Sequence, residues 1–213
     1  MARVEIVSIP NGQFVQNCYL VGDERAAVMI DPGEEASRFL RELTRRNWKL
    51  QAIWLTHGHI DHIMGVETIL GAHPVPVYLH PADRPLYDGL AQQARLMGFE
   101  WPPAPAPTHE LHHGDHLTIG DARFEVRHVP GHSPGSVAFV APGMIIGGDV
   151  LFNSSIGRTD LPGGDFATLM HSIQAEFLSR PDSTRVYSGH GPETTIGVER
   201  ETNPFITGAY RLE

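Results

Sequence analysis

Histidine and aspartate residues of the kind that bind metal ions follow four apolar segments of this sequence. Imidazole nitrogens and carboxylate oxygens are common protein ligands of divalent cations. Each of the four apolar runs ends in or beside glycine, and together they precede seven such residues: His57, His59, Asp61, His62, His132, Asp149 and His190. Seven ligands are enough for two metal ions. The pattern therefore indicates metal-dependent catalysis.

The first four of these residues lie in the heptapeptide Thr-His-Gly-His-Ile-Asp-His at positions 56–62, directly after a predicted buried strand. Residues two apart in extended backbone point the same way, so we expect His57 and His59 to share one ion. Asp61 and His62 come further along the turn and suit a neighbouring ion. Gly58 is expected to let this loop bend tightly.

The other three ligands follow separate predicted strands. His132 comes after the alternating segment 123–129 and a Pro-Gly turn, Asp149 after the apolar run 144–146 and two glycines, and His190 after 185–187 and Ser-Gly. Glycine is expected where the backbone must closely approach a crowded ion centre. The repeated order of strand, glycine and ligand predicts that all four strands deliver their ligands to one rim.

The elements that must position these side chains can be predicted from periodicity and turn residues. Apolar runs predict strands at 3–9, 14–21, 25–31 and 52–55, and turn signals predict hairpins at 109–130 and 136–148. Apolar residues at helical spacing predict a helix from 36 to about 45 and another from 166 to 177, which Asp165 can cap. Two sheets with outer helices follow, which is a four-layer α/β/β/α sandwich in a single domain spanning residues 1–213.

Residues 81–108 are predicted to form a helix followed by a proline-rich segment at 101–107. We favour a rigid connector over the surface; the alternative is a lid or pocket wall that carries Phe99 and Trp101. Histidines also gather beyond this segment, at His109, His112, His113 and His116, around the turn signal Gly114-Asp115. We expect an exposed hairpin there, and a structural role for His128.

Composition narrows the function further. The 213-residue chain has a formal net charge of −9 and 19% charged residues, so no basic stripe is available for nucleic acid or an anionic membrane. Its single cysteine, Cys18, lies in a strand-like segment and is expected to be a buried hydrophobe. The N-terminus lacks the long apolar region of a signal peptide, and no apolar run approaches membrane-spanning length. We therefore expect a cytoplasmic enzyme acting on a small molecule, while the oligomeric state stays open.

At this point the sequence resembles the metallo-β-lactamase superfamily, and within it the short glyoxalase II-like (hydroxyacylglutathione hydrolase-like) proteins. Five motifs carry the resemblance in family order over nearly the whole chain: Thr-His-x-His-x-Asp-His at 56–62, Gly-His-Ser-Pro-Gly-Ser at 131–136, Gly-Asp at 148–149, Ile-Gly-Arg-Thr-Asp at 156–160 and Gly-His-Gly-Pro at 189–192. Chance assembly of all five motifs in that order is very improbable.

The resemblance implies a role for each of the seven residues. His57, His59 and His132 would bind the first metal ion, Asp61, His62 and His190 the second, and Asp149 would bridge both. Zinc is the expected metal, with iron or manganese as alternatives. Two divalent ions carry +4 and two aspartates remove 2, so a metal-bound hydroxide at this centre, flanked by Asp61 and Asp149, would serve as the nucleophile.

The implied activity is hydrolysis of a thioester of the acylglutathione type. Arg158 would pair with a substrate carboxylate or instead form a brace with Asp160. An alternative is a persulfide dioxygenase with one iron, held by His57, His132 and Asp149 as a facial triad. Lactonases, β-lactamases and a non-enzymatic role of the ions remain further alternatives that the ligand pattern leaves open.

Overall fold

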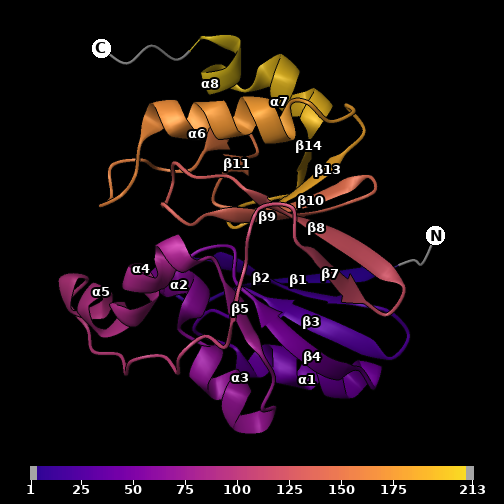
Figure 1. The fold of residues 1–213 in the computed structure, drawn as a ribbon, viewed down its shortest axis with the longest axis vertical. Helices are drawn as coiled ribbons and strands as arrows, with labels where there is room; N and C mark the ends of the chain where they lie inside the picture. Colours follow the sequence, from indigo (N-terminus) through magenta and orange to yellow (C-terminus); the bar gives the residue numbers. More distant parts are fainter. Residues whose placement is uncertain (1–3, 210–213) are drawn as a thin grey trace.

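The chain folds into two six-stranded sheets that pack face to face, with helices on both outer faces. A computed structural model describes residues 4–209. Figure 1 shows the four layers: α1 and α3 lie below the first sheet, and α6 and α7 lie above the second. The four-layer α/β/β/α sandwich predicted from the sequence is therefore confirmed.

The first sheet has the strand order β1-β2-β3-β4-β5-β6. Its strands are β1 (Glu5–Asn11), β2 (Gln16–Gly22), β3 (Ala26–Ile30), β4 (Lys49–Trp54), β5 (Val77–Leu79) and β6 (His109–Glu110). The first three pair antiparallel, and β3, β4, β5 and β6 pair parallel. The strands predicted at 14–21, 25–31 and 52–55 correspond to β2, β3 and β4. The strand predicted at 3–9 overlaps β1 over residues 5–9, but β1 begins two residues later and continues to Asn11. Position 3 lies outside the described residues.

The second sheet has the order β14-β13-β10-β9-β8-β7. It contains β7 (His116–Ile119), β8 (Ala122–His128), β9 (Val137–Ala141), β10 (Met144–Gly148), β13 (Arg185–Ser188) and β14 (Thr194–Thr195). The β9–β10 hairpin is as predicted, and β10 pairs parallel with β13. A separate two-stranded ribbon is formed by β11 (Leu151–Phe152) and β12 (Ser155–Ile156).

The hairpin predicted at 109–130 is wrong in its extent. β6 pairs with β5 in the first sheet, and the chain crosses to the second sheet before β7. The hairpin therefore spans only β7 and β8, and its turn is at Gly120 (φ 54°) rather than at Gly114. Both glycines adopt positive φ, so local turn chemistry alone could not choose between them. Burial of Leu111 between the sheets places the crossover upstream of β7.

The helices cover the outer faces and one end of the sandwich. They are α1 (Ser37–Arg46), α2 (Ile60–Ile63), α3 (Val66–Ala72), the 3-10 turn η1 (Pro81–Asp83), α4 (Arg84–Asp88), α5 (Leu90–Leu96), α6 (Phe166–Ser172), its π-helical continuation η2 (Ile173–Phe177), α7 (Ile196–Thr202) and α8 (Pro204–Thr207). Asp165 caps α6 as predicted, because its side chain accepts a hydrogen bond from the backbone N–H of Thr168 at 2.7 Å. Within residues 4–209 no helix is long and apolar enough to cross a membrane.

Three apolar layers hold the four structural layers together. Phe39 and Ile69 pack in the layer between the first sheet and its helices, Trp54 and Phe139 between the two sheets, and Leu169 in the layer under α6. Cys18 is fully buried, and burial followed by the nearby Asp31 carboxylate raises the pKa of its thiol well above the usual range. This confirms the prediction that Cys18 is a buried hydrophobe.

The proline-rich segment that follows α5 is fastened to the surface. The indole N–H of Trp101 donates to the carbonyl of Met64 at 3.1 Å, and the hydroxyl of Tyr87 donates to the carbonyl of Pro105 at 2.7 Å. Phe99 and Trp101 pack against the apolar layer beneath the first sheet. These contacts support the connector and not the lid.

Candidate metal centre

The seven candidate ligands lie together where the strands of both sheets end. His57 and His59 follow β4, His132 follows β8, Asp149 directly follows β10, and His190 follows β13. Asp61 and His62 were expected along a turn, but they lie on the single-turn helix α2. The helical coil places both side chains beside His190 and Asp149, whereas extended backbone would turn them apart.

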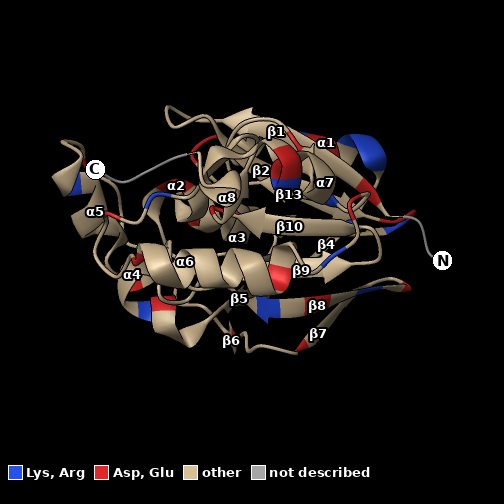
Figure 2. Cartoon of the chain, turned by 90° about the horizontal axis from the view of Figure 1, so that it is seen from above, with Lys and Arg blue, Asp and Glu red and all other residues tan. Residues whose placement is uncertain are grey.

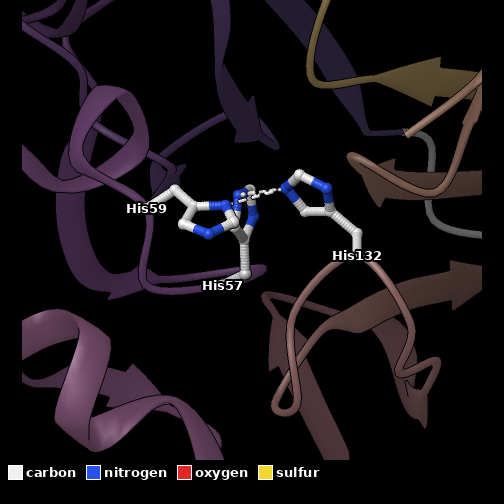
Figure 3. Close-up of side chains that lie close together, drawn as sticks. All are labelled: His57, His59 and His132. Atoms are coloured by element: carbon white, nitrogen blue, oxygen red, sulfur yellow. Dashed lines mark hydrogen bonds between the residues drawn. The ribbon is translucent and has the colours of Figure 1, made fainter. Parts of the chain in front are cut away.

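Three imidazoles form a first group. The Nδ1 atom of His59 lies 2.8 Å from Nε2 of His132, which lies 3.2 Å from Nε2 of His57. Figure 3 shows the three rings turned toward one another, two from the loop after β4 and one from the opposite half of the molecule. Three ring nitrogens that converge in this way make a group that could hold a metal ion.

Hydrogen bonds at the far side of the His57 and His132 rings decide which of their nitrogens face the centre. Nδ1 of His132 donates to the carbonyl of Arg158 at 2.8 Å. The hydroxyl of Thr56 donates to Asp31 at 2.6 Å, so it accepts from Nδ1 of His57 at 3.0 Å. In neutral His57 and His132, the Nε2 atoms consequently carry lone pairs toward the first group.

A second group lies next to the first. The Oδ2 atom of Asp61 lies 3.1 Å from Nε2 of His190 and 3.5 Å from Nε2 of His62. The carboxylate of Asp149 lies between the groups, with Oδ1 3.4 Å from His62 and Oδ2 3.6 Å from His132 and 3.5 Å from His190. Asp149 is therefore placed to touch an ion in either group.

Two buried atoms show that this centre is built for a cation. Nε2 of His62 and Oδ1 of Asp149 are both buried, and neither has a hydrogen-bond partner. Nδ1 of His62 already donates to Asp31 at 2.9 Å, so neutral His62 directs a bare lone pair at the Asp149 carboxylate. Two electron-rich buried atoms would repel each other unless a positive charge joins them. A proton on His62 or a divalent ion would supply that charge, and the set of imidazole and carboxylate donors fits a divalent ion.

The pKa values of the histidines differ between the two groups. Burial lowers the pKa of His59 to about 4, and burial together with the neighbouring imidazoles lowers that of His57 well below its ordinary value. Both rings are thus neutral at pH 7, the form that binds metal. Burial also opposes the charged form of His62, but Asp61 and Asp149 outweigh it and raise its pKa well above the ordinary value. This half of the centre attracts a proton or a metal ion.

Glycines allow the loops to approach this closely. A Cβ on Gly189 would collide with the Asp149 carboxylate, and a Cβ on Gly148 (φ 53°) would lie 2.5 Å from Oγ1 of Thr56. Gly58 has a different reason from the tight bend that we expected: its Cβ would lie 2.9 Å from the carbonyl of Asp83. The prediction that glycine marks close approach of the backbone is confirmed at Gly148 and Gly189, while Gly58, which we expected to allow a tight bend, is required by the contact with Asp83.

A pocket of about 380 Å³ opens over both groups. Its walls include five of the candidate ligands, His59, Asp61, His132, Asp149 and His190. Their neighbours in the wall are mostly apolar: Phe14, Ile60, Met97, Phe152, Ile156 and Leu161, with Gln93, Ser155 and Arg158. The guanidinium of Arg158 forms two 2.7 Å hydrogen bonds with Asp160, and both side chains are exposed. The brace is therefore present, and Arg158 also borders the pocket.

Asp31 is a residue of the centre that the sequence analysis did not single out, because it was predicted only as the last residue of the strand at 25–31. Its buried carboxylate accepts hydrogen bonds from the backbone N–H of Thr56 at 2.7 Å, from the Thr56 hydroxyl and from His62. Asp31 has a φ of 54°, which is unusual for a residue other than glycine. The available signal was that Asp31 ends an apolar strand, as the candidate ligands do.

The remaining histidines lie apart from the centre. His128 has the structural role that we expected: its Nε2 atom donates to the carbonyl of Pro134 at 2.9 Å, and its ring stacks on His80 with centroids 4.2 Å apart. His109, His112, His113 and His116 belong to β6, β7 and the crossover, and within residues 4–209 they form none of the groups close enough to hold a metal ion.

Basic residues are dispersed over the surface and have acidic residues as neighbours, as Figure 2 shows on α1 and β8.

Comparisons with known proteins agree with this geometry. Residues 11–190 match the family model of the metallo-beta-lactamase superfamily. Hydroxyacylglutathione hydrolase GloC of Haemophilus influenzae is 36% identical, covering 95% of this chain and 98% of its own. The crystal structure of BLEG-1, described as a B3 metallo-beta-lactamase, has a TM-score of 0.90 and 42% identity, covering 96% and 100% of the two chains. TTHA1623 in a di-iron-bound form has a TM-score of 0.86 and 43% identity, covering 93% and 99%.

Proposed function

The chain belongs to the metallo-β-lactamase superfamily, and from this membership and its metal centre we propose that it hydrolyses small-molecule thioesters of the acylglutathione type. The observation that carries the proposal is the pair of adjacent ligand groups with the Asp149 carboxylate between them. The similarity to GloC over 95% of this chain supports the choice of thioester among the substrates of metallo-hydrolases.

We assign two divalent metal ions to this centre, with zinc as the leading candidate and iron or manganese as alternatives. His57, His59 and His132 would hold one ion, Asp61, His62 and His190 the other, and Asp149 would bridge them. Two such ions supply Lewis-acid polarisation of the substrate carbonyl and lower the pKa of a shared water to near neutrality. The similarity to a di-iron-bound structure supports a dinuclear site.

The residues of the chain then orient the reaction. The carboxylates of Asp61 and Asp149 border the pocket and face the imidazoles of His190 and His62, so they are placed to orient a water molecule and accept its hydrogen bonds. Phe14, Met97 and Phe152 give the pocket apolar walls that exclude bulk water from the acyl group. Arg158 can reach a substrate carboxylate only by sharing its guanidinium with Asp160.

The experiment that tests this proposal compares two substrates in two atmospheres. Metal-loaded protein is assayed with S-lactoylglutathione and with glutathione persulfide, each in air and without oxygen. A thioester hydrolase should release thiol from S-lactoylglutathione at the same rate in both atmospheres, because hydrolysis consumes no oxygen. Oxygen uptake stoichiometric with persulfide, together with no thioester cleavage, would assign the iron-dependent dioxygenase instead.

A second candidate function is hydrolysis of a β-lactam amide. The observation that favours it is the 42% identity with BLEG-1, described as a B3 metallo-beta-lactamase, over the whole of that chain. Both reactions attack a carbonyl carbon and pass through an anionic tetrahedral species, so the same centre could serve either. The chromogenic cephalosporin nitrocefin distinguishes them: a kcat/KM for nitrocefin that exceeds the value for S-lactoylglutathione would favour the β-lactamase.

A further inference from the structure

A buried carboxylate outside the ligand set joins the two loops that carry the first group. Asp83 is the last residue of the 3-10 turn η1, between β5 and α4, and it is 0% exposed. Its Oδ2 atom accepts from the backbone N–H of Gly58 at 2.8 Å and from the hydroxyl of Ser133 at 2.7 Å. Its Oδ1 atom accepts from the backbone N–H of Gly135 at 2.5 Å.

These partners stand beside the candidate ligands on both loops. Gly58 lies between His57 and His59, and Ser133 follows His132 directly. The two loops come from different sheets, because one follows β4 and the other follows β8. One carboxylate therefore sets the distance between the two halves of the first group.

The loops are shaped around this carboxylate. A Cβ on Gly135 would lie 2.6 Å from the backbone nitrogen of Asp83 and 2.8 Å from the Cγ atom of Asp83. A Cβ on Gly58 would lie 2.9 Å from the backbone carbonyl oxygen of Asp83. Any larger residue at either position would push the loop away from Asp83. The close approach of both loops thus requires glycine, and the approach brings their N–H groups onto the carboxylate.

The chemistry of the partners requires an acid at this position. Gly58 and Gly135 can only donate through their backbone N–H groups, and Ser133 is the donor toward Asp83. Among the described residues no lysine or arginine forms an ion pair with Asp83. The three hydrogen bonds offset only part of the cost of its burial, because burial still raises the pKa of the Asp83 carboxyl above its ordinary value. An isosteric amide would turn its NH₂ group toward at least one of these donors.

We propose that Asp83 is a positioning residue that holds the His57–His59 loop and the His132 loop so that their three ring nitrogens converge on one metal ion. The inference rests on the proposed metal-dependent function but goes beyond it, because it assigns a task to a residue that touches no ligand side chain. The inference also predicts different effects on the two groups. Asp83 hydrogen-bonds to the loops of the first group, and it forms no hydrogen bond with Asp61, His62 or His190 among the described residues.

The test measures metal binding without substrate. Zinc is titrated into metal-free wild type, Asp83→Asn, Ser133→Ala and the control Asp88→Asn against a chromophoric chelator, and cobalt spectra report the ligand geometry. Asp88 is an exposed acid of the neighbouring helix α4, paired with Arg84 at 2.7 Å. In Asp83→Asn the affinity for one zinc equivalent should fall about 10- to 100-fold, because a residue that holds the ligand loops is lost. The affinity for the other equivalent should stay within about threefold of the wild-type value. The cobalt spectrum of the weakened equivalent should change, and Ser133→Ala should give a smaller effect in the same direction.

Each other outcome overturns the inference. Two unchanged affinities in a folded Asp83→Asn variant would mean that the carboxylate does not position the ligands. Equal weakening of both equivalents, with a lowered melting temperature and an unchanged cobalt spectrum, would mean a general structural role. If Asp83→Asn does not fold, Ser133→Ala decides by the same criteria. Failure of the wild type itself to bind metal would instead refute the proposed function, so the two failures are distinguishable.

Discussion

The Oδ2 atom of Asp31 lies 2.9 Å from Nδ1 of His62, and both side chains are buried. This carboxylate accepts a hydrogen bond from Nδ1–H of His62, so Nε2 of the same ring is free to face Asp61 and Asp149. Such carboxylate–histidine pairs fix the tautomer of a metal ligand and raise its basicity. The relationship links the end of β3, which carries none of the seven predicted ligands, to the second metal group.

Replacing Asp31 by asparagine should weaken the second metal equivalent. Asparagine tolerates the positive φ of this position, but it offers one oxygen to three donors, so the orientation of His62 should loosen. We expect an affinity loss of about 10- to 100-fold for that equivalent, measured by chelator competition. Asp88→Asn, an exposed acid, is the matched control. An unchanged affinity for both ions would contradict this role of Asp31.

Metal removal should abolish activity and leave the fold. The three apolar layers do not depend on an ion, so chelator-treated protein should still unfold cooperatively, at a lower temperature than the loaded protein. Added zinc, iron or manganese should restore activity. Careful loading should approach two ions per chain, because the group of His57, His59 and His132 lies next to the group of Asp61, His62 and His190 with Asp149 between them. Metal analysis and titration measure this; saturation at a single ion would refute the dinuclear site.

Asp149→Ala should remove more activity than His190→Ala. Asp149 lies within 3.6 Å of imidazoles of both groups, whereas His190 lies beside Asp61 and Asp149 and would serve the second ion alone. Loss of Asp149 should cost more than the roughly 10- to 100-fold typical of outer-shell partners, and both ions should be released. His190→Ala should keep one tightly bound ion. The assay is kcat/KM with metal content on the same samples, and a fully loaded, active Asp149→Ala would show that it does not bridge.

His80 should lower the free energy of unfolding as the pH falls into the mildly acidic range. Burial, followed by the neighbouring His128 and His112, lowers the pKa of His80 to about 4, while the unfolded chain titrates near 6.5. Between pH 6.5 and pH 4 the unfolded state binds more protons at His80 than the folded state does. The contribution of neutral His80 to the free energy of unfolding is therefore complete above pH 6.5 and is lost as the pH falls toward 4. Urea unfolding of metal-free wild type and His80→Asn from pH 7 to pH 4.5 measures the difference, because the other groups titrate in both. Parallel curves would contradict the lowered pKa.

Local patterns explain how much of the fold could be predicted. The strands around the ligands, the cap of α6 by Asp165 and the β9–β10 hairpin depend on residues that are neighbours in the sequence, and these predictions are confirmed. The crossover between β6 and β7 was predicted wrongly because two glycine turns, at Gly114 and Gly120, give the same local signal. Packing of the sheets, which is not local, chose between them.

The sequence by itself determined the fold class, the family and the strand, glycine and ligand order that brings seven side chains to one edge, because periodicity and turn residues are properties of short segments. Only the tertiary structure decided what holds those side chains in place. Asp31 meets His62 and Asp83 meets Ser133 across 31 and 50 residues of sequence. These hydrogen bonds exist because separate strands and helices dock in one arrangement. The local sequence shows that Asp31 ends a strand, but it does not show which distant side chain either aspartate meets.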